Sequence, residues 1–319
     1  MKGFPKKIAV ALAIALSLIL PLFIRSPFIQ HILVIIGINT ILVLGLDMAL
    51  GHCGLVSLGH AGFMGIGAYT GVLLVMKLNM PFLVGLFGGT VSAGLCGILI
   101  GYPSLRLRGH YFVIVTFICG IVFTLLFTNL ISVTKGPMGI PRIPPAEIAI
   151  GDLVTISFKT KLSFYYLVIT SILVLLYIKQ RLYSSKMGRA LIAVKEDEEL
   201  AKSVGISTNF YKVTIFAVST AIAGFAGVLY AHYVRFIGPD SFTMVQSFNY
   251  FVMNLIGGSG TMIGPLIGPM LLTTIDELSQ LFKPEVARVL FGLALIVIIL
   301  YMPKGIMGLI HRLASRERV

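Results

Sequence analysis

The sequence has few charged residues for its length. Charged residues make up 12% of its 319 positions, hydrophobic residues make up 57%, and the mean hydropathy is +0.98. A soluble domain has about a quarter of its residues charged, so this chain lacks the groups needed for a water-facing surface. The composition excludes an ordinary soluble protein and predicts that lipid covers most of the surface.

Signals for catalysis and for metal binding are also missing. The three cysteines, Cys53, Cys96 and Cys119, lie in apolar stretches and form neither a disulfide framework nor a CxxC pair. His52 and His60 lack the spacing of a metal site. No GxxxxGK[ST] loop, nucleophile elbow or kinase signature occurs. We therefore expect a non-catalytic chain with no metal or cofactor of its own, and any nucleotide hydrolysis must occur on a partner.

The net charge of +13 does not form a stripe with interleaved aromatic residues, as nucleic-acid binding would require. Basic residues instead lie between apolar runs, where they act as topology signals. We expect ten transmembrane helices, with eight to ten as the range, in a single all-α transmembrane domain over residues 1–319. The expected spans are 8–24, 31–50, 57–76, 82–100, 111–131, 164–178, 213–231, 245–257, 264–282 and 286–301.

The loops set the expected orientation. With both termini in the cytoplasm, most of the basic residues fall on the cytoplasmic side. The N-terminal segment imitates a signal peptide but has no small-residue cleavage site before Arg25, so we expect an uncleaved first span. Segment 132–163 contains four prolines and is expected to form an external cap or docking surface. Segment 179–212 is expected to be a cytoplasmic loop.

The cytoplasmic loop contains one amphipathic pattern. From Met187 it reads MGRALIAVKEDEELAKSVGI, with apolar residues near helical spacing. Glu198 precedes Lys202 by four residues, which favours a helical ion pair, and Gly205 is a natural stop. We expect a short helix outside the bilayer, between spans 6 and 7. It is either a solvated linker or a helix whose apolar face docks into a partner.

A glycine-rich stretch follows the second span. From Leu46 it reads LDMALGHCGLVSLGHAGFMGIGAYTG. The glycines either interrupt helices beside a translocation pathway or allow helices to pack closely. Asp47 is the one acid placed well inside a span. It either lines the pathway or lies in water at the cytoplasmic end.

The loop and the glycine-rich stretch resemble permeases of the branched-chain amino acid (leucine/isoleucine/valine) ABC importer family. Similar motifs continue in the family's order to Pro303–Gly308, and the long external loop resembles the M-type subunit. Leu200, Asp47 and His52 depart from the usual family residues. The matching coupling-loop residues are Gly188, Arg189, Glu196, Asp197, Glu198, Glu199, Ala201 and Gly205. The matching glycine motifs are Gly51, Gly54, Gly59, Gly67, Gly257, Gly258, Gly260, Gly264 and Gly268.

The resemblance implies an importer in a bacterial inner membrane. It would comprise a second, non-identical permease subunit, two ATPase subunits that hold ATP and Mg, and an extracytoplasmic solute-binding protein. The solute would be a branched-chain amino acid, or a related small solute such as urea or a short amide. Candidate residues for the translocation pathway are Asn39, Asp47, His52, Ser57, His60, Tyr69, Asn249 and Asn254.

Two other classes of function stay open from the sequence. An ion-coupled secondary transporter of a small polar solute would need charged relays in several spans, and Asp47 alone fits that pattern. An intramembrane enzyme would have to use His52, His60 and Asp47. Whether uptake depends on ATP or on an ion gradient distinguishes an ABC importer from a secondary transporter.

Overall fold

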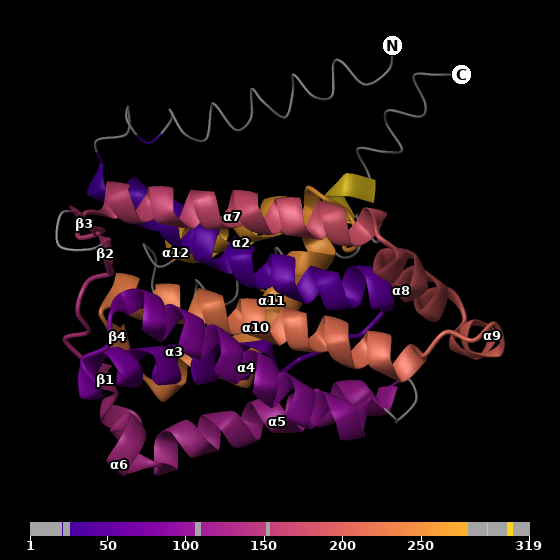
Figure 1. Ribbon diagram of the computed structural model, residues 1–319. Helices are drawn as coiled ribbons and strands as arrows, with labels where there is room; N and C mark the ends of the chain where they lie inside the picture. Colours follow the sequence, from indigo (N-terminus) through magenta and orange to yellow (C-terminus); the bar gives the residue numbers. More distant parts are fainter. Residues whose placement is uncertain are drawn as a thin grey trace.

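The structure is a computed structural model that describes residues 21, 26–105, 110–150, 154–279, 292 and 305–308. The described chain is mostly helical, and its long helices run side by side along one axis (Figure 1). The expected spans at 8–24 and 286–301 fall almost entirely outside the described residues. The expected spans between them can be compared with observed helices.

Two helices of 27 residues form the centre of the bundle, α2 (Pro27–Cys53) and α10 (Thr208–Val234). In their most apolar windows 78% and 61% of the residues are buried. The corresponding value is 28% for α4 (Phe82–Ser104), α5 (His110–Asn129) and α7 (Lys161–Ser184). Helices that are apolar on all sides either lie in a core or face lipid. The central pair therefore forms the core, and the other three helices expose apolar faces.

Five helices in the described part of the chain are long and apolar enough to cross a membrane: α2, α4, α5 from Tyr111, α7 and α10. They coincide with five of the expected spans. Three further expected spans are also helices, but they are shorter or less apolar: α3 (His60–Lys77), α11 (Met244–Gly257) and α12 (Gly264–Ser279). The polytopic helical class is thus established, whereas the count of ten stays a prediction.

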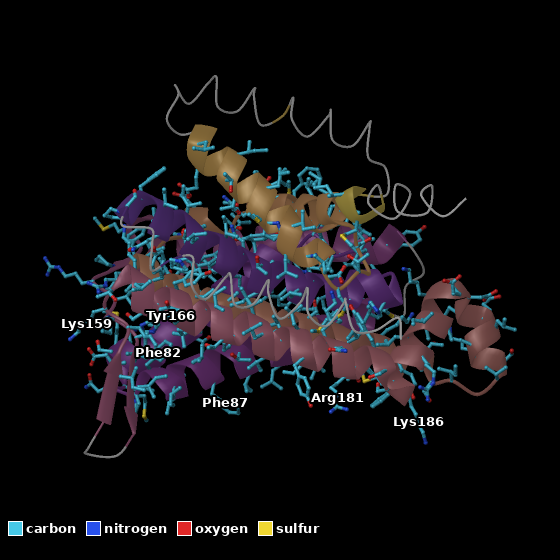
Figure 2. The ribbon with its side chains drawn as sticks, turned by 90° about the horizontal axis from the view of Figure 1, so that it is seen from above. Phe82, Phe87, Lys159, Tyr166, Arg181 and Lys186 are labelled. Atoms are coloured by element: carbon cyan, nitrogen blue, oxygen red, sulfur yellow. The ribbon has the colours of Figure 1, made fainter. Side chains whose placement is uncertain are left out.

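Side chains are distributed along the bundle as a membrane protein requires. Figure 2 shows Lys159 at one end of the bundle, Arg181 and Lys186 toward the other end, and Phe87 between them on the outer surface. The Phe87 side chain is 72% exposed. Charged groups are costly inside a bilayer, so an exposed apolar side chain at mid-length with basic groups at the two ends fits a membrane-spanning bundle.

One end of the bundle contains short strands, which corrects the all-α expectation. Strand β1 (Ile140–Pro141) follows α6 (Ile131–Thr134) and the 3₁₀ turn η1 (Gly136–Met138). It pairs with β4 (Phe236–Ile237), which precedes the 3₁₀ turn η2 (Pro239–Phe242). Strands β2 (Glu147–Ile150) and β3 (Val154–Ser157) form an antiparallel hairpin, with Glu147 opposite Ser157. Prolines at 141, 144 and 145 prevent a helix here, and β-branched residues favour strands. The described residues of segment 132–163 are thus structured, whereas their role as an external cap stays a prediction.

The opposite end contains two helices where one was expected. Helix α8 (Lys186–Glu196) and helix α9 (Glu198–Ser203) are separated at Asp197, whose φ of −152° is extended. The Asp197 carboxylate accepts hydrogen bonds from the backbone N–H of Glu199 and of Leu200. An aspartate at this position stabilises a new helix start, so the acidic run that looked continuous with α8 begins a second helix.

Candidate functional site

The candidate coupling residues lie on the α8–α9 unit, which forms the end of the molecule opposite the strands (Figure 1). The backbone N–H of Gly188 donates to the hydroxyl of Ser185, which caps α8. Gly188 and Ala201 are buried and Glu198 is half-buried. The exposed members of the set are Arg189, Glu196, Asp197, Glu199 and Gly205.

The apolar face of α8 packs on the chain's own helices. Ala190, Leu191 and Val194 are buried, and α8 contacts α2, α7 and α10. Of the two alternatives left by the sequence, a solvated linker or a face that docks into a partner, neither describes this buried face of α8. The most exposed apolar side chains of the unit lie on α9 and just after it: Leu200 is 64% exposed and Val204 is 69% exposed, whereas Ile192 of α8 is 43% exposed. A partner that contacts apolar groups of this unit would therefore meet mainly Leu200 and Val204.

Glu198 links α9 to α10 through an ion pair with Lys212. One carboxylate oxygen lies 2.9 Å from Lys202 Nζ, which confirms the expected helical ion pair, and 2.8 Å from Lys212 Nζ. Lys212 is buried and also donates to the backbone carbonyl of Leu105. Burial alone would raise the pKa of Glu198, but hydrogen bonds and positive charge from Lys212 and Lys202 outweigh it and lower the pKa to about 2.

Gly205 ends the unit as the sequence predicts. Its φ is +86°, which is the left-handed region that favours glycine. Its backbone N–H donates to Lys202 O, and that of Ile206 donates to Ala201 O. This turn reverses the chain direction into α10.

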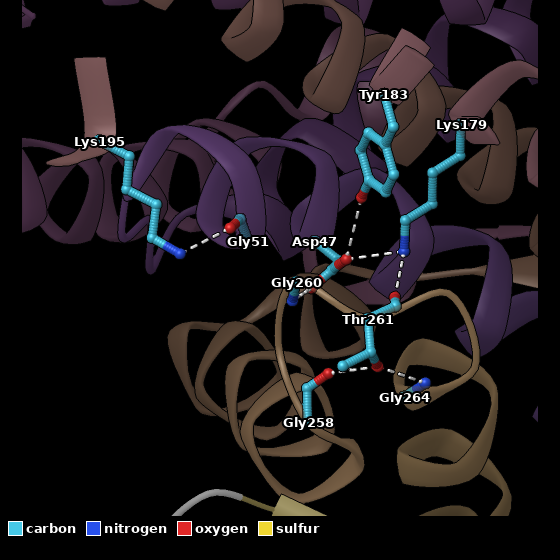
Figure 3. A network of polar contacts seen from close by, with 9 residues as sticks. All are labelled: Asp47, Gly51, Lys179, Tyr183, Lys195, Gly258, Gly260, Thr261 and Gly264. Carbon is cyan, nitrogen blue, oxygen red and sulfur yellow. Dashed lines mark hydrogen bonds and ion pairs between the residues drawn. The ribbon is translucent and has the colours of Figure 1, made fainter. Parts of the chain in front are cut away.

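Asp47 lies at the centre of a buried polar network between α2, α7 and the α11–α12 turn (Figure 3). One of its carboxylate oxygens lies 2.7 Å from Lys179 Nζ, and both side chains are 0% exposed. The other oxygen accepts the backbone N–H of Gly260 at 2.7 Å. Lys179 also donates to the carbonyl of Thr261, and the Tyr183 hydroxyl lies 3.4 Å from the carboxylate.

This geometry decides one of the alternatives left by the sequence. Asp47 is not in water at the end of its helix, because it is fully buried and ion-paired within the described chain. A buried charge persists only when it is paired and hydrogen-bonded, and Lys179 supplies that partner. The network joins the far part of the chain to α2, because Gly260 and Thr261 belong to the later glycine motif.

Lys179 and Lys212 were missed as site residues. Both were counted among loop cations, because each lies next to the end of an apolar run. Each pairs with an acid, Lys179 with Asp47 and Lys212 with Glu198. No sequence signal identifies these pairs, because 132 residues separate Asp47 from Lys179 and the 14-residue separation between Glu198 and Lys212 includes the turn from α9 into α10.

His52 lies beside the Asp47 network. Its ring stacks on the ring of Tyr183, and its Nδ1 has no hydrogen-bond partner among the described residues. Nearby, Lys195 of α8 donates from Nζ to the backbone carbonyl of Gly51 at 2.8 Å (Figure 3). The end of α2 is thus attached to the α8–α9 unit by a direct side-chain contact.

A second buried polar group lies between α3 and α10. His60 is 0% exposed, and its two ring nitrogens lie 2.9 Å from Ser57 Oγ and 2.7 Å from Ser219 Oγ. Two other candidates, Tyr69 on α3 and Asn254 on α11, are buried with a hydroxyl and both amide atoms, respectively, that have no partner in the described chain. Unpaired buried polar atoms are uncommon in native proteins.

The last two pathway candidates lie elsewhere. Asn39 donates to Thr273 Oγ1 at 2.9 Å and so links α2 to α12. Asn249 is half-buried on α11. The structure therefore does not gather all eight candidates at one point.

Some glycines of the signature interrupt helices, and others allow helices to pack closely. Gly54 has φ +71° and ends α2, and the segment from there to Gly59 is not helical. Gly67 lies inside α3, where a Cβ atom would overlap the backbone of Gly224 on α10. The later motif is similar: Gly257 and Gly268 approach neighbouring backbone, and Gly258 and Gly260 have positive φ in the turn before Gly264.

No cluster of three or more His, Cys, Asp or Glu side chains suited to a metal ion occurs in the part of the chain that the structure describes. His52 and His60 lie in separate groups, one beside Tyr183 and the other between Ser57 and Ser219.

Comparison with known proteins places the chain in a family of transport proteins. A family model described as branched-chain amino acid transport system / permease component matches residues 28–299. The high-affinity branched-chain amino acid transport system permease protein LivM of Salmonella typhimurium is 34% identical over 289 residues, which are 85% of this chain and 68% of that protein. LivM of Escherichia coli K12 is 33% identical with the same coverage.

More distant relatives include a second subunit type. LivH of Salmonella typhimurium is 25% identical over 84% of this chain and 90% of its own length. LsrC of Yersinia pseudotuberculosis, an autoinducer 2 import system permease, is 26% identical over 68% of this chain and 62% of its own length. No solved structure matches this chain.

Proposed function

Because this chain belongs to the family of permease components of branched-chain amino acid transport systems, we propose that it forms half of the channel of an ATP-driven importer for these amino acids. It is a membrane permease subunit and not an enzyme. Its higher identity to LivM than to LivH assigns it to the M-type subunit. A second, H-type permease would complete the channel.

The observation that supports this function best is the α8–α9 unit. It projects from the bundle, is attached to the core helices by Glu198–Lys212 and by Lys195–Gly51, and exposes Leu200 and Val204. A small apolar patch on a rigidly attached helix suits docking into a groove of another protein. The proposed partners at this end are two ATPase subunits, which bind ATP and Mg.

We propose the orientation of the chain in the membrane from the position of the α8–α9 unit. With α8 and α9 in the cytoplasm, the strand end faces outward and would meet an extracytoplasmic solute-binding protein. We retain ten spans, both termini inside, and a bacterial inner membrane as the complete arrangement. The basic residues between apolar runs support this orientation.

For the solute path we favour three buried polar residues, His60, Tyr69 and Asn254. Tyr69 and Asn254 have side-chain donors and acceptors with no hydrogen-bond partner among the described residues. Such groups are costly in a membrane unless they serve a function. Asp47 instead has its partner in Lys179, and we assign it to the transmission of movement rather than to solute contact.

The alternative of an ion-coupled secondary transporter has lost its main support. It depended on Asp47 as a charge relay, and Asp47 is held in an ion pair with Lys179. The relatives LivM and LivH are permeases of branched-chain amino acid transport systems. The solute named for these relatives is a branched-chain amino acid, although LsrC shows that the family also imports other molecules.

The docking role is tested with the double variant Leu200→Ser/Val204→Ser. Both side chains are exposed, so we expect unchanged thermal stability of the purified chain. ATP-dependent leucine uptake by the reconstituted complex should fall at least tenfold, because the apolar contact with the ATPase is lost. The matched control is Phe87→Ser, a 72% exposed residue that lies between the two ends of the bundle, which should transport normally. Normal uptake by the double variant would show that α9 does not dock the ATPase.

A further inference from the structure

A cavity of about 380 Å³ lies at the strand end of the bundle, between the starts of α2 and α7 and the end of α10. This volume is within the range of small-ligand pockets. Polar and aromatic side chains line it, among them His31, Lys159, Lys161, Phe164, His232 and Arg235. Figure 2 shows Lys159 extending from this end of the molecule.

The charges around the cavity favour an anion. Three basic residues line it and none of the lining residues is acidic. Lys159 pairs with Glu147 at 3.1 Å, and Glu277 on α12 acts electrostatically on His31 and Tyr233. Among the described residues, Arg235 has no carboxylate within ion-pair distance. Lys161 donates a hydrogen bond to the backbone carbonyl of Pro27, which is a neutral acceptor. The described surroundings therefore retain a net positive charge.

His232 adds an observation that does not depend on charge. The residue is 2% exposed and lines the cavity. Its Nδ1 lies 2.8 Å from the carbonyl oxygen of Pro144, and because a carbonyl only accepts, Nδ1 must carry the hydrogen. In the neutral ring Nε2 is then an acceptor, and it has no partner among the described residues. A ligand that supplies an O–H donor would satisfy it.

The position of the cavity identifies the kind of molecule. It lies where three helices long and apolar enough to cross a membrane have their ends, α2, α7 and α10. The ends of membrane-spanning helices are placed near the lipid headgroups of either leaflet. Basic pockets between such helices on the cytoplasmic side bind headgroup phosphates, and the same charge attraction applies to an anionic headgroup at the strand end. Phe28 and Ile29, in the first turn of α2, are 44% and 42% exposed and offer adjacent apolar surface.

We propose that this cavity binds the headgroup of an anionic phospholipid that also carries a hydroxyl group, as phosphatidylglycerol does. The phosphate lies against Arg235 and Lys161, and a headgroup hydroxyl donates to His232 Nε2. The site is independent of the transported solute, and it anchors the strand end of the bundle to one lipid.

The phosphate contact is tested with Arg235→Asn and a matched control, Arg142→Asn. Both arginines are exposed at the strand end and have similar left-handed backbone, with φ of +60° and +58°, but Arg142 does not line the cavity. Binding of phosphatidylglycerol to the full-length chain is measured by native mass spectrometry. We expect about fivefold weaker binding for Arg235→Asn and no change for Arg142→Asn. Equal binding by all three proteins overturns the proposal.

The hydroxyl contact is tested with phosphatidylmethanol, which has the same charge as phosphatidylglycerol but no headgroup hydroxyl. The wild type should prefer phosphatidylglycerol. His232→Asn retains a donor for Pro144 and removes the Nε2 acceptor, so the preference should disappear. A preference retained by His232→Asn contradicts the assigned contact.

A third arm distinguishes lipid from soluble anions. Free glycerol phosphate and leucine are titrated in thermal-unfolding experiments with each protein, and unfolding without ligand checks that each variant folds. We expect stabilisation by phosphatidylglycerol and none by the soluble compounds. Stabilisation of the wild type by glycerol phosphate or leucine, abolished in Arg235→Asn, would overturn the lipid assignment.

Discussion

Asp47 and Lys179 illustrate what a buried ion pair requires in a bundle of apolar helices. Each is 0% exposed, and their charges are satisfied by each other, by Gly260 N–H and by Thr261 O. Removal of one partner leaves an uncompensated buried charge, which costs far more than the intact pair contributes. The pair thus fixes α7 and the α11–α12 turn against α2.

Asp47→Asn should lower the free energy of unfolding by about 3–5 kcal/mol, because Lys179 stays charged and buried without its partner. Asp47→Asn/Lys179→Met should recover part of this loss, since no charge remains and the asparagine oxygen still accepts from Gly260. Thermal unfolding in detergent measures both. Glu147→Gln, which breaks the exposed pair with Lys159, is the control and should change little. A double variant as unstable as Asp47→Asn would refute this explanation.

Glu198 gives a prediction for pH. Its pKa falls from 4.5 to about 2 in the folded chain, so the carboxylate contributes stability that is fully present above pH 4.5 and is lost as the pH falls toward 2. Relative to Glu198→Gln, the wild type should therefore lose stability between pH 5 and pH 3 and show no difference in slope between pH 6 and pH 8. Unfolding temperatures across this range measure the effect, and identical slopes below pH 5 would be inconsistent with it.

Among individual residues, the sequence identified Asp47 as important and Glu198–Lys202 as a pair. It could not identify Lys179 or Lys212 as their partners. Those contacts join positions far apart in the chain, and they exist only after the helices pack.

Among the helices, the close approach of α3 and α10 depends on glycine. A Cβ on Gly67 would overlap the backbone of Gly224, and backbone cannot move aside as a flexible side chain can. Such contacts between small residues allow helices to approach closely in lipid, where no hydrophobic force drives them together.

Gly67→Ala should therefore destabilise the bundle by about 1–3 kcal/mol. The control is Gly120→Ala in α5, where the nearest atoms lie 3.5 Å from the position that a Cβ would take, an ordinary contact distance. Thermal unfolding of both variants tests this difference. If Gly67→Ala and Gly120→Ala were equally stable, α3 and α10 would be able to move apart at Gly67 without loss of stability, which would contradict this explanation.

The helix positions could be predicted from apolar runs, because period and length are local properties. The break at Asp197 and the hairpin at Glu147–Ser157 could not. The first depends on whether an acidic residue caps a new helix or continues the old one. The second depends on pairing between short segments with weak individual preferences. Burial of the α8 face against α2, α7 and α10 is likewise a property of the assembled bundle.

Across the bundle as a whole, the two ends have different chemistry. One end has the α8–α9 unit, attached by ion pairs and exposing Leu200 and Val204; the other has the strands and a basic cavity. Lys195 and Glu198 connect the α8–α9 end to the central helices α2 and α10. This arrangement suits a permease whose conformational change is driven by ATPase subunits bound at the α8–α9 end.

The decisive experiment is leucine uptake by proteoliposomes that contain this chain with its second permease, ATPases and binding protein. We predict uptake that requires hydrolysable ATP, continues when ion gradients are dissipated, and stops when the ATPase subunits are omitted. Uptake by this chain without ATPase subunits, driven by an imposed ion gradient, would contradict the proposed function.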